Sequence, residues 1–562
     1  MADTLILGSI AKEYDPKLIR IAGPWCLPEE LLEEAHNFKI APEPFAQSKN
    51  LELAIAQTKA LCQDYLPKIV AKIAPESNLP ASYWEFLLLP WLALVAEQII
   101  ERWSRIQLMM DVWGKDALNI EIVDVAHSKL NFATEETLML QGILGIPFNH
   151  LLFSTLLSKA LLPKTWKLIT VKPLVISYPA KTEAFSIKRL VKHFLSFLYV
   201  PHLKGFSLWQ SLRFSWALRH PSFGHDKSQL LQDAAPLTKE LELLKLPGDL
   251  LPFILQCLPA SIKSLKHPKK LKEVSYPRLR LASISAYEDC NYRQRLARWR
   301  GAGNRIGFVQ HGGNYGQIRY PCRTALVEYS QHVFLTWGWH EYAGIAGNFK
   351  PIPYPQLTPL HNAWCGANNP TILFIGTEMP LFGYRLDSHP TPWQIVDYRS
   401  AKLKFFKALP NDLVAQTLYR PYFTLPGTLK DWDYVQKNVA DLKKCQGPLE
   451  PQMLKSRLLI LDHHGTTWLQ ALVANIPHLL FWNKDHWPLT DYCNEWLQEF
   501  KAVGIWFATP EACAKRVAEI YKDIPKWWQT KPIQRLRRAF CAEFAETSPY
   551  TNLLWLRLLK KL

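Results

Sequence analysis

The last third of the chain alternates short apolar runs with stretches whose apolar residues recur every three or four positions. Runs of the first kind predict strands, and stretches of the second kind predict helices. We expect strands at 371–375, 417–419, 457–461, 478–482 and 505–507, and helices at 393–409, 467–474, 490–503 and 510–520. Strands that alternate with helices of this length form parallel βαβ units. The pattern therefore predicts a doubly wound α/β sheet.

The first 350 residues mix helical stretches with short strands. Helices are expected at 50–112 and 136–144, and strands near 5–7, 119–125, 305–310 and 333–337. The most apolar stretch, Phe86–Ala96, contains Pro90 and is far shorter than the ~20 residues of a membrane span, so it predicts a buried helix. Prolines crowd residues 351–370, which favours a linker. We therefore expect units at 1–350 and 371–545, joined by this linker, and an amphipathic C-terminal helix at 546–562.

Composition changes this picture in two ways. A formal net charge of +17 favours anionic partners, such as nucleotides, phospholipid headgroups or polyanions. The 10 cysteines form no CxxC pair, which argues against a zinc site and for reduced thiols in the cytoplasm. The first residues lack a basic segment followed by a long apolar run, so no signal peptide is expected.

Two basic segments, 187–222 and 261–280, carry aromatic residues among their cations. Such segments are usually solvated faces, but the combination also suits an anionic membrane surface. We therefore expect a cytoplasmic protein that can lie at the inner membrane face, without nucleic acid as a partner.

The segment Asp462–Thr467 lies between a predicted strand and a predicted helix. A strand that ends in glycine and hydroxyl residues before a helix presents unpaired N–H groups and the positive end of a helix dipole. Such a turn can hold a phosphate or a carboxylate. We expect Thr466 or Thr467 to cap the helix, and Gln470 to reach a ribose hydroxyl. The candidates for donor binding here are His464, Gly465, Thr466, Thr467 and Gln470. An ordinary βα turn is the alternative.

A second glycine-rich loop, Gln310–Gly316, also follows a predicted strand. Its glycines allow the backbone to approach a ligand closely. His311 at the end of the strand is the candidate catalytic base, and Glu328 on the next helix is a candidate to orient it. The other loop candidates are Gln310, Gly312, Gly313 and Tyr315. A histidine satisfied within its own turn is the alternative.

Two further strand ends carry candidate residues. Gly376, Thr377 and Glu378 follow the strand at 371–375, and Arg420 ends the strand at 417–419. Ligands of doubly wound sheets bind outside the carboxyl ends of the strands. Arg420 suits an anionic donor, and Glu378 is a second catalytic candidate. The pair Asp431 and Asp433 is a weak match to a metal site, and no metal is expected.

Several of these motifs resemble an uncharacterised, leptospiral-type family of transferases from bacterial surface-carbohydrate loci. The resemblance spans most of the chain and is densest between 280 and 545. It rests on QHGGNYG, FLTWGWHEY, PLFGYRLDSHPTPWQIVDY, LYRPYF, DHHGTTWLQALVANIPHLLFWN and IQRLRRAFCAEFA.

The family in turn is similar to GT-B glycosyltransferases, in which two Rossmann-like domains face a cleft. The resemblance implies a GT-B-like α/β fold with a helical elaboration of an N-terminal, acceptor-side domain and a C-terminal domain that binds a nucleotide-sugar. Gly465, Thr466 and Thr467 would hold the donor phosphates, Arg420 would contact the anionic donor, and His311 would face the cleft. This chain has Gln470 where such folds often have a ribose-binding Glu, and His463 is unusual there.

The sequence thus predicts a metal-independent glycosyltransferase without a cofactor. It would move a sugar from a nucleotide-activated donor to a surface glycan or a lipid-linked acceptor. A sugar-nucleotide epimerase or hydrolase using Glu378, and a non-enzymatic protein that binds polyanions or membrane surfaces, are the alternatives. The transferase hypothesis requires that the glycine-bearing loops around residues 311 and 465 face each other and hold a negatively charged leaving group between them.

Overall fold

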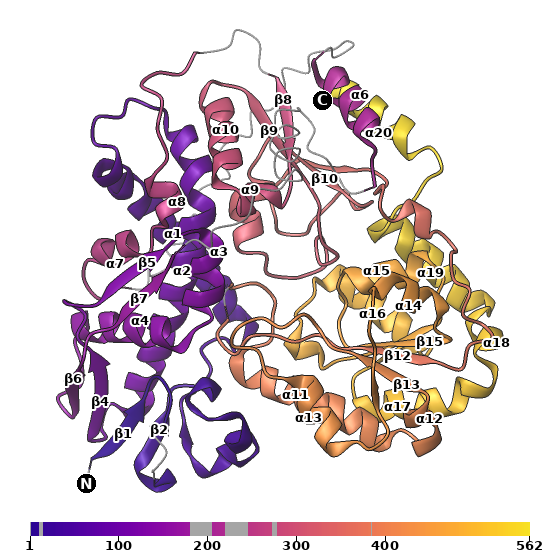
Figure 1. The fold of residues 1–562 in the computed structure, drawn as a ribbon, viewed down its shortest axis with the longest axis horizontal. Helices are drawn as coiled ribbons and strands as arrows, with labels where there is room; N and C mark the ends of the chain where they lie inside the picture. Colours follow the sequence, from indigo (N-terminus) through magenta and orange to yellow (C-terminus); the bar gives the residue numbers. More distant parts are fainter. Residues whose placement is uncertain (1, 11–14, 180–204, 220–244, 273–277, 384) are drawn as a thin grey trace.

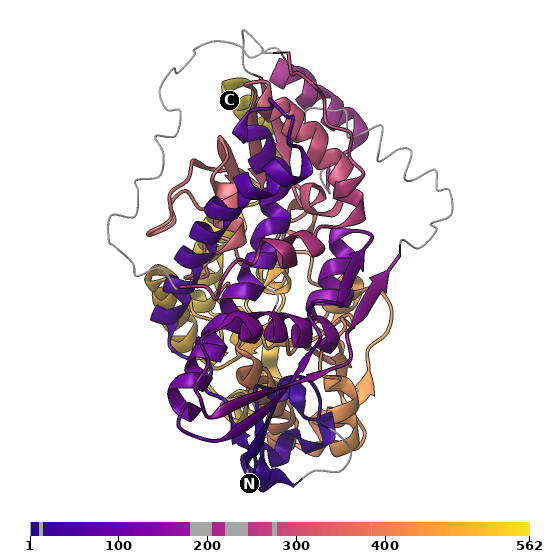
Figure 2. The same ribbon diagram turned by 90° about the vertical axis from the view of Figure 1, so that its left-hand side faces the viewer.

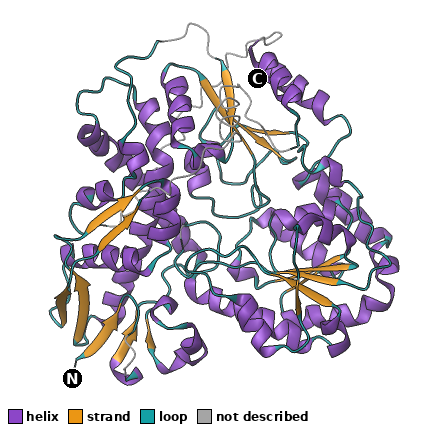
Figure 3. Cartoon of the chain, in the orientation of Figure 1, coloured by secondary structure: helices purple, strands orange, loops and turns teal. Residues whose placement is uncertain are grey.

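The computed structural model describes residues 2–10, 15–179, 205–219, 245–272, 278–383 and 385–562. Within them, the strands form one separate two-stranded pair and three larger parallel sheets with helices between them (Figures 1 and 3). We call these the N-terminal, middle and C-terminal sheets. The chain is therefore a mixed α/β protein, as the strand–helix alternation predicts. Most of the basic segment 187–222 lies outside the described residues.

The N-terminal sheet has the strand order β3-β2-β1-β4-β6. Its strands are β1 (Asp3–Ile6), β2 (Ile19–Ile21), β3 (Lys39–Ile40), β4 (Leu118–Val123) and β6 (Trp166–Val171). Strands β5 (Lys129–Phe132) and β7 (Val175–Tyr178) form a separate parallel pair. The helices of this part are α1 (Ser48–Ile73), α2 (Ala81–Trp113), α3 (Glu135–Thr137) and α4 (Ile146–Lys159).

Helix α2 joins the N-terminal and middle parts of the molecule. It packs against α4 and against α10 (Cys290–Gly301). Figure 2 shows α1 and α2 on the face of the molecule that lies at the left in Figure 1. Among the described residues, α2 is long and apolar enough to cross a membrane, as is the pair Glu135–Ile143 and Ile146–Lys159 if its 84° bend is ignored. However, 89% of the apolar window of α2 is buried inside the protein. The predicted buried helix at 86–96 is thus confirmed as part of a longer one.

The middle sheet has the order β11-β10-β9-β8. Its strands are β8 (Leu279–Ala282), β9 (Arg305–Val309), β10 (Val333–Thr336) and β11 (Phe349–Pro351). The helices around it are α6 (Leu208–Arg219), α7 (Leu251–Gln256), α8 (Ala260–Lys263), α9 (Ser285–Glu288), α10 and the C-terminal α20 (Thr551–Lys561). Helix α20 packs beside α6, and Trp555 of α20 is fully buried there, so the predicted C-terminal helix packs on the body of the protein.

The C-terminal sheet has the order β14-β13-β12-β15-β16-β17, all parallel. Numbered within this sheet, the order is 3-2-1-4-5-6, which is the Rossmann order. The strands are β12 (Ile372–Ile375), β13 (Thr417–Arg420), β14 (Lys443–Lys444), β15 (Leu458–Leu461), β16 (His478–Phe481) and β17 (Trp506–Phe507). The helices are α11 (Pro392–Ala408), α12 (Asn411–Ala415), α13 (Asp431–Asn438), α14 (Leu449–Lys455), α15 (Thr466–Val473), α16 (Asp491–Ala502), α17 (Pro510–Ile520), α18 (Ile524–Trp528) and α19 (Lys531–Phe544).

Candidate active site

Three central strands of the C-terminal sheet end at the same level. Ile375 of β12 pairs with Arg420 of β13 on one side and with Leu461 of β15 on the other. The loops that begin at Gly376 and at Asp462 therefore leave the same edge of the sheet. The strand order reverses between β12 and β15, and in open α/β sheets this is where ligands bind.

A buried lysine lies between these two loops and contacts both of them. The ammonium group of Lys402 on α11 donates to Asp431 Oδ2 and to the carbonyl oxygen of Thr377, and it lies 3.4 Å from Asp462 Oδ2. The Asp462 carboxylate in turn accepts the backbone N–H of Thr377 at 3.0 and 3.1 Å. Thr377, a candidate for donor binding, thus has its backbone N–H group already paired. Lys402 is the residue that the sequence reasoning missed, because a lysine in the middle of a helix carries no local signal of burial.

Glu378 follows directly in the loop after β12, and its side chain is nearly buried. Burial, together with the carboxylates of Asp431 and Asp462, raises the pKa of Glu378 to about 7, although the Lys402 charge acts in the opposite direction. A carboxyl group with such a pKa can both take up and release a proton near neutral pH. Glu378 therefore has the properties of a general acid or base at the reversal point of the sheet.

Hydrogen bonds of the buried Gln310 side chain hold the loop after β9 in place. Its side-chain oxygen accepts from the backbone N–H of Trp337 and from the indole N–H of Trp339, and its amide donates to the carbonyl of Gly312. Gln310 is 1% exposed, so in this conformation it shapes the loop and does not face a ligand.

The two glycine-bearing loops touch each other. The backbone N–H of Gly313 donates to Thr466 Oγ1 at 2.9 Å. A Cβ at Gly313 would lie 2.6 Å from the carbonyl carbon of Gly465 and closer still to the backbone nitrogen of Thr466, so no larger residue fits here. The carboxyl ends of the middle and C-terminal sheets therefore meet at this contact.

The prediction that Thr466 or Thr467 caps α15 is wrong. The N-cap residue is Gly465, which provides no side-chain cap, and Thr466 is the first helical residue. The reason is that both threonines lie inside the first turn, past the N-cap position, and the Thr466 hydroxyl accepts the Gly313 N–H instead. The first turn of α15 is thus covered by Gly313 in this conformation.

His311 is part of a hydrogen-bonded group on the middle sheet. The Tyr315 hydroxyl lies 2.7 Å from His311 Nε2 and 3.2 Å from Glu328 Oε1. Tyr287 donates to the same Glu328 oxygen at 2.9 Å. Burial and the Glu328 charge raise the pKa of Tyr315 well above its usual range, so its hydroxyl keeps its proton. The His311 ring is 23% exposed, whereas Glu328 is buried beneath it.

His463 and His464 pack against aromatic rings. The His463 ring centroid lies 4.3 Å from that of Trp487, and His464 lies 5.6 Å from Trp487 and 5.7 Å from Trp482. Both ring nitrogens of His464 are buried without a hydrogen-bond partner, and burial lowers its pKa to about 3. His464 is therefore a neutral ring inside the protein here and does not reach the surface of the site.

Arg420 and Gln470 lie at the border of the site. The Arg420 guanidinium donates to the carbonyl of Gly447 at 2.7 Å, and the backbone N–H of Gly376 donates to the Arg420 carbonyl at 3.0 Å. A Cβ at Gly376 would lie 2.5 Å from the hydroxyl of Tyr419, which explains the glycine. Gln470 is partly exposed one turn into α15.

A cavity of about 300 Å³ lies beside these loops. Its walls come from α2, from the loop that follows Glu378 and from the residues after β16. Charged side chains from both chain halves line it, namely Glu43, Glu97, Glu101, Arg319, Arg385, Asp387, Lys484 and Asp485. Burial raises the pKa of Glu97 to about 7. Within the described residues, no group of three or more His, Cys, Asp or Glu side chains is arranged to hold a metal ion.

Comparison with known proteins supports one conclusion. The model of the family described as "LIC12162 family transferase" matches residues 3–559. The chain therefore belongs to this transferase family, and the resemblance stated from the sequence is confirmed. Comparison with curated proteins gives no match.

Proposed function

We propose that this member of the LIC12162 transferase family is a glycosyltransferase with a GT-B-like arrangement. It would transfer a sugar from a nucleotide-activated donor to a surface glycan or a lipid-linked acceptor in the cytoplasm. The observation that carries the proposal is the contact between Gly313 and Thr466, because it joins the carboxyl ends of two parallel sheets. A donor and an acceptor held by different units can meet at such a junction.

The chemistry would be divided between the two loops. A base, His311 or Glu378, would accept the proton of an acceptor hydroxyl while its oxygen attacks the anomeric carbon of the donor. The bond to the nucleotide phosphate would break, and Arg420 would stabilise the charge on the leaving phosphate. The positive end of α15 would add to this in a conformation in which Gly313 no longer covers it. The Rossmann order of the C-terminal sheet supports donor binding there.

The donor phosphate would need a cation besides the glycine loop. Three carboxyl groups, those of Glu378, Asp431 and Asp462, lie around Thr377, and the ammonium of Lys402 is already engaged with Asp431 and the Thr377 carbonyl. We therefore place the phosphate toward Arg420 and the sugar toward Glu378, whose carboxyl group suits hydroxyl ligands.

A thermal-shift panel with UDP-, GDP-, CMP- and dTDP-sugars tests the donor proposal. A donor that binds the native state raises the melting temperature, by a free energy that grows with its concentration. We expect one nucleotide class to stabilise the protein and this shift to shrink in Arg420→Ala. The matched control is Arg538→Ala, which removes an exposed arginine on α19. An equal response to all four classes, or none, contradicts the proposal.

Product analysis separates transfer from the two related activities. With the stabilising donor and a cell-surface glycan extract, a transferase forms a sugar–acceptor product, a hydrolase releases free sugar without acceptor, and an epimerase changes the sugar of the donor. We expect turnover to be lost in His311→Ala and retained in His36→Ala, a control at an exposed histidine.

A further inference from the structure

The cavity of about 300 Å³ beside the candidate active site has walls from both halves of the chain. Glu43 and Glu97 line it from the first half, and residues between Met379 and Ile395 line it from the second. Its wall begins directly after Glu378, whereas neither Arg420 nor the first turn of α15 belongs to it. A ligand in this cavity would therefore lie next to Glu378 without occupying the place proposed for the donor phosphate.

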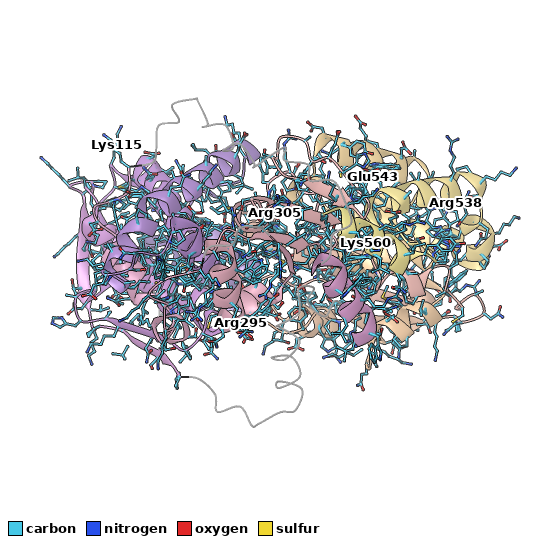
Figure 4. The ribbon with its side chains drawn as sticks, turned by 90° about the horizontal axis from the view of Figure 1, so that it is seen from above. Lys115, Arg295, Arg305, Arg538, Glu543 and Lys560 are labelled. Atoms are coloured by element: carbon cyan, nitrogen blue, oxygen red, sulfur yellow. The ribbon has the colours of Figure 1, made fainter. Side chains whose placement is uncertain are left out.

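The buried carboxyl groups of this cavity lack hydrogen-bond partners. Within the part of the chain that the structure describes, three carboxylate oxygens are buried without a partner, namely both of Glu97 and Oε1 of Glu43, and both residues line the cavity. The unpartnered Nδ1 of His389 belongs to the same wall. Charged side chains usually extend into solvent, as Lys115 and Arg538 do (Figure 4). Because a buried polar group without a partner costs free energy, we expect molecules in the cavity to supply the missing hydrogen bonds.

Glu97 on α2 is the clearest of these groups. It is 1% exposed, and none of the ion pairs among the described residues includes it. The Cys322 thiol and the Leu386 backbone N–H lie near its carboxyl group and favour the charged form, but neither makes a hydrogen bond to it. Glu101, one turn further along the same helix, is paired with Arg105. The fold thus supplies a partner for one of these two glutamates and none for the other, which is typical of a residue kept for binding.

The charges around Glu97 are balanced. The positive charge of Arg323 and the negative charge of Asp387 act on its carboxyl group in opposite directions, and Arg385 Nη1 lies 3.7 Å from Asp387 Oδ2. Much of the remaining wall is apolar, including Phe45, Leu51, Met379, Pro380, Ile395 and Leu489. A charged ligand would upset this balance. A neutral molecule with hydroxyl groups and apolar faces, such as a sugar ring, would satisfy both parts of the wall.

We propose that this cavity binds a neutral sugar unit of the acceptor and that the Glu97 carboxyl group hydrogen-bonds to its hydroxyl groups. Its volume lies at the lower end of the range for small-ligand pockets, about 300–1,000 Å³, which suits a single sugar unit. A sugar bound there would lie beside Glu378, a candidate for the catalytic base. That the sugar belongs to the acceptor rests on the proposed function, whereas the sugar site itself rests on the cavity.

Saturation-transfer difference NMR with the full-length protein tests the proposal. The probes are the methyl glycosides of glucose, galactose, mannose and N-acetylglucosamine, titrated singly. We expect at least one of them to bind, and its fully O-methylated form to bind at least about tenfold more weakly, since it has no hydroxyl to donate. Glu97→Leu should weaken binding of the unmodified glycoside by a similar factor, and Glu97→Gln, which keeps the shape of the side chain, by less. The matched control is Glu85→Leu, which removes an exposed carboxylate from the same helix.

Thermal unfolding separates a binding role from a structural one. Glu97 has no partner to lose, so Glu97→Leu should melt at or above the temperature of the wild type. A lower melting temperature of both Glu97 variants would assign the residue a structural role and overturn the proposal. The proposal is also overturned if no glycoside binds, since the cavity then holds water alone, or if Glu97→Leu binds the glycoside as well as the wild type does.

The donor panel distinguishes this inference from the proposed function. Stabilisation by the nucleotide-sugar should be unchanged in Glu97→Leu, because the residue lies outside the place proposed for the donor phosphate. If no nucleotide-sugar binds but a glycoside binds through Glu97, the transfer reaction is wrong and the sugar site remains. If a nucleotide-sugar binds and glycoside binding does not depend on Glu97, only the present inference fails.

Discussion

The backbone N–H of Gly313 donates a hydrogen bond to Thr466 Oγ1, although 153 residues separate the two positions. The bond closes the middle sheet against the C-terminal sheet at their carboxyl ends. It also brings the two loops that the sequence singles out into one place, as the sequence hypothesis requires.

Gly313→Ala should separate these loops. A Cβ at this position has no room beside the Gly465 carbonyl and the Thr466 nitrogen, and both obstacles are backbone atoms. We expect a loss of about 1–3 kcal/mol in the free energy of unfolding, measured with urea, and a loss of donor binding. Gly312→Ala is the control, because its Cβ would meet Tyr315 at an ordinary 3.4 Å. Equal effects of the two substitutions would contradict the close contact.

Glu378→Gln should change how the protein depends on pH. In the folded protein the pKa of Glu378 is about 7, above its ordinary value of 4.5, so the folded state favours the protonated form. The wild type should therefore lose stability as the pH rises from about 4.5 to about 7, by roughly 1–2 kcal/mol, and the variant should not show this loss. Urea unfolding at several pH values measures the difference, and Glu495→Gln, at an exposed position on α16, is the control. In the wild type, an ionised Glu378 acting as base gives activity that rises with pH through about 7.

Lys402→Met should be strongly destabilising. The substitution leaves Asp431 and Asp462 buried without their shared cation, for which a cost of about 3–5 kcal/mol is expected. The double variant Lys402→Met/Asp431→Asn should lose less than the sum of the two single variants, because each single change leaves an unbalanced charge. Additive losses in urea unfolding would show that the two groups do not interact.

Acid should destabilise the protein through the histidines around Trp487. Burial lowers the pKa of His389, His463 and His464, so these rings are neutral in the folded state, whereas unfolded histidines titrate at 6.5. Stability is then fully present above pH 6.5 and falls as the pH is lowered toward each folded-state pKa, by about 1.4 kcal/mol per pH unit and per histidine. His464→Leu should reduce this slope without loss at neutral pH, since the ring makes no hydrogen bond. If the stability of His464→Leu falls with pH as steeply as that of the wild type, His464 does not contribute to the acid sensitivity.

Tyr315→Phe should impair catalysis by leaving His311 without its hydrogen bond. We expect a roughly tenfold lower kcat with little change in KM, and a shift of the pH profile. Tyr521→Phe serves as the control, because its hydroxyl bonds to the carbonyl of Pro370 away from this site. Unchanged kcat and pH profile would assign Tyr315 a purely structural role.

The C-terminal sheet could be predicted almost completely from the sequence. Each predicted strand between 371 and 507 has a counterpart among β12, β13, β15, β16 and β17, because buried parallel strands are continuous apolar runs. Short strands such as β3 (Lys39–Ile40) and β14 (Lys443–Lys444) were not predicted, since two residues at the edge of a sheet carry no pattern.

The division of the first half of the chain between two larger sheets and the β5–β7 pair was not foreseen either. It depends on pairings between strands far apart in the sequence, such as β1 with β4, which periodicity does not report. The same limit applies to the site. The motifs located the loops, but the burial of His464, the central place of Lys402 and the use of the Thr377 N–H by Asp462 are properties of packing.

The position of helix α2 affects how the first half of the chain unfolds. Its 33 residues form one uninterrupted element that is packed on α4 of the N-terminal part and on α10 of the middle part. If either part unfolds, buried apolar surface of this shared helix becomes exposed to water. The two parts should therefore unfold together in a single cooperative transition. Because α2 contacts both parts, a displacement of either sheet should be passed to the other through this helix.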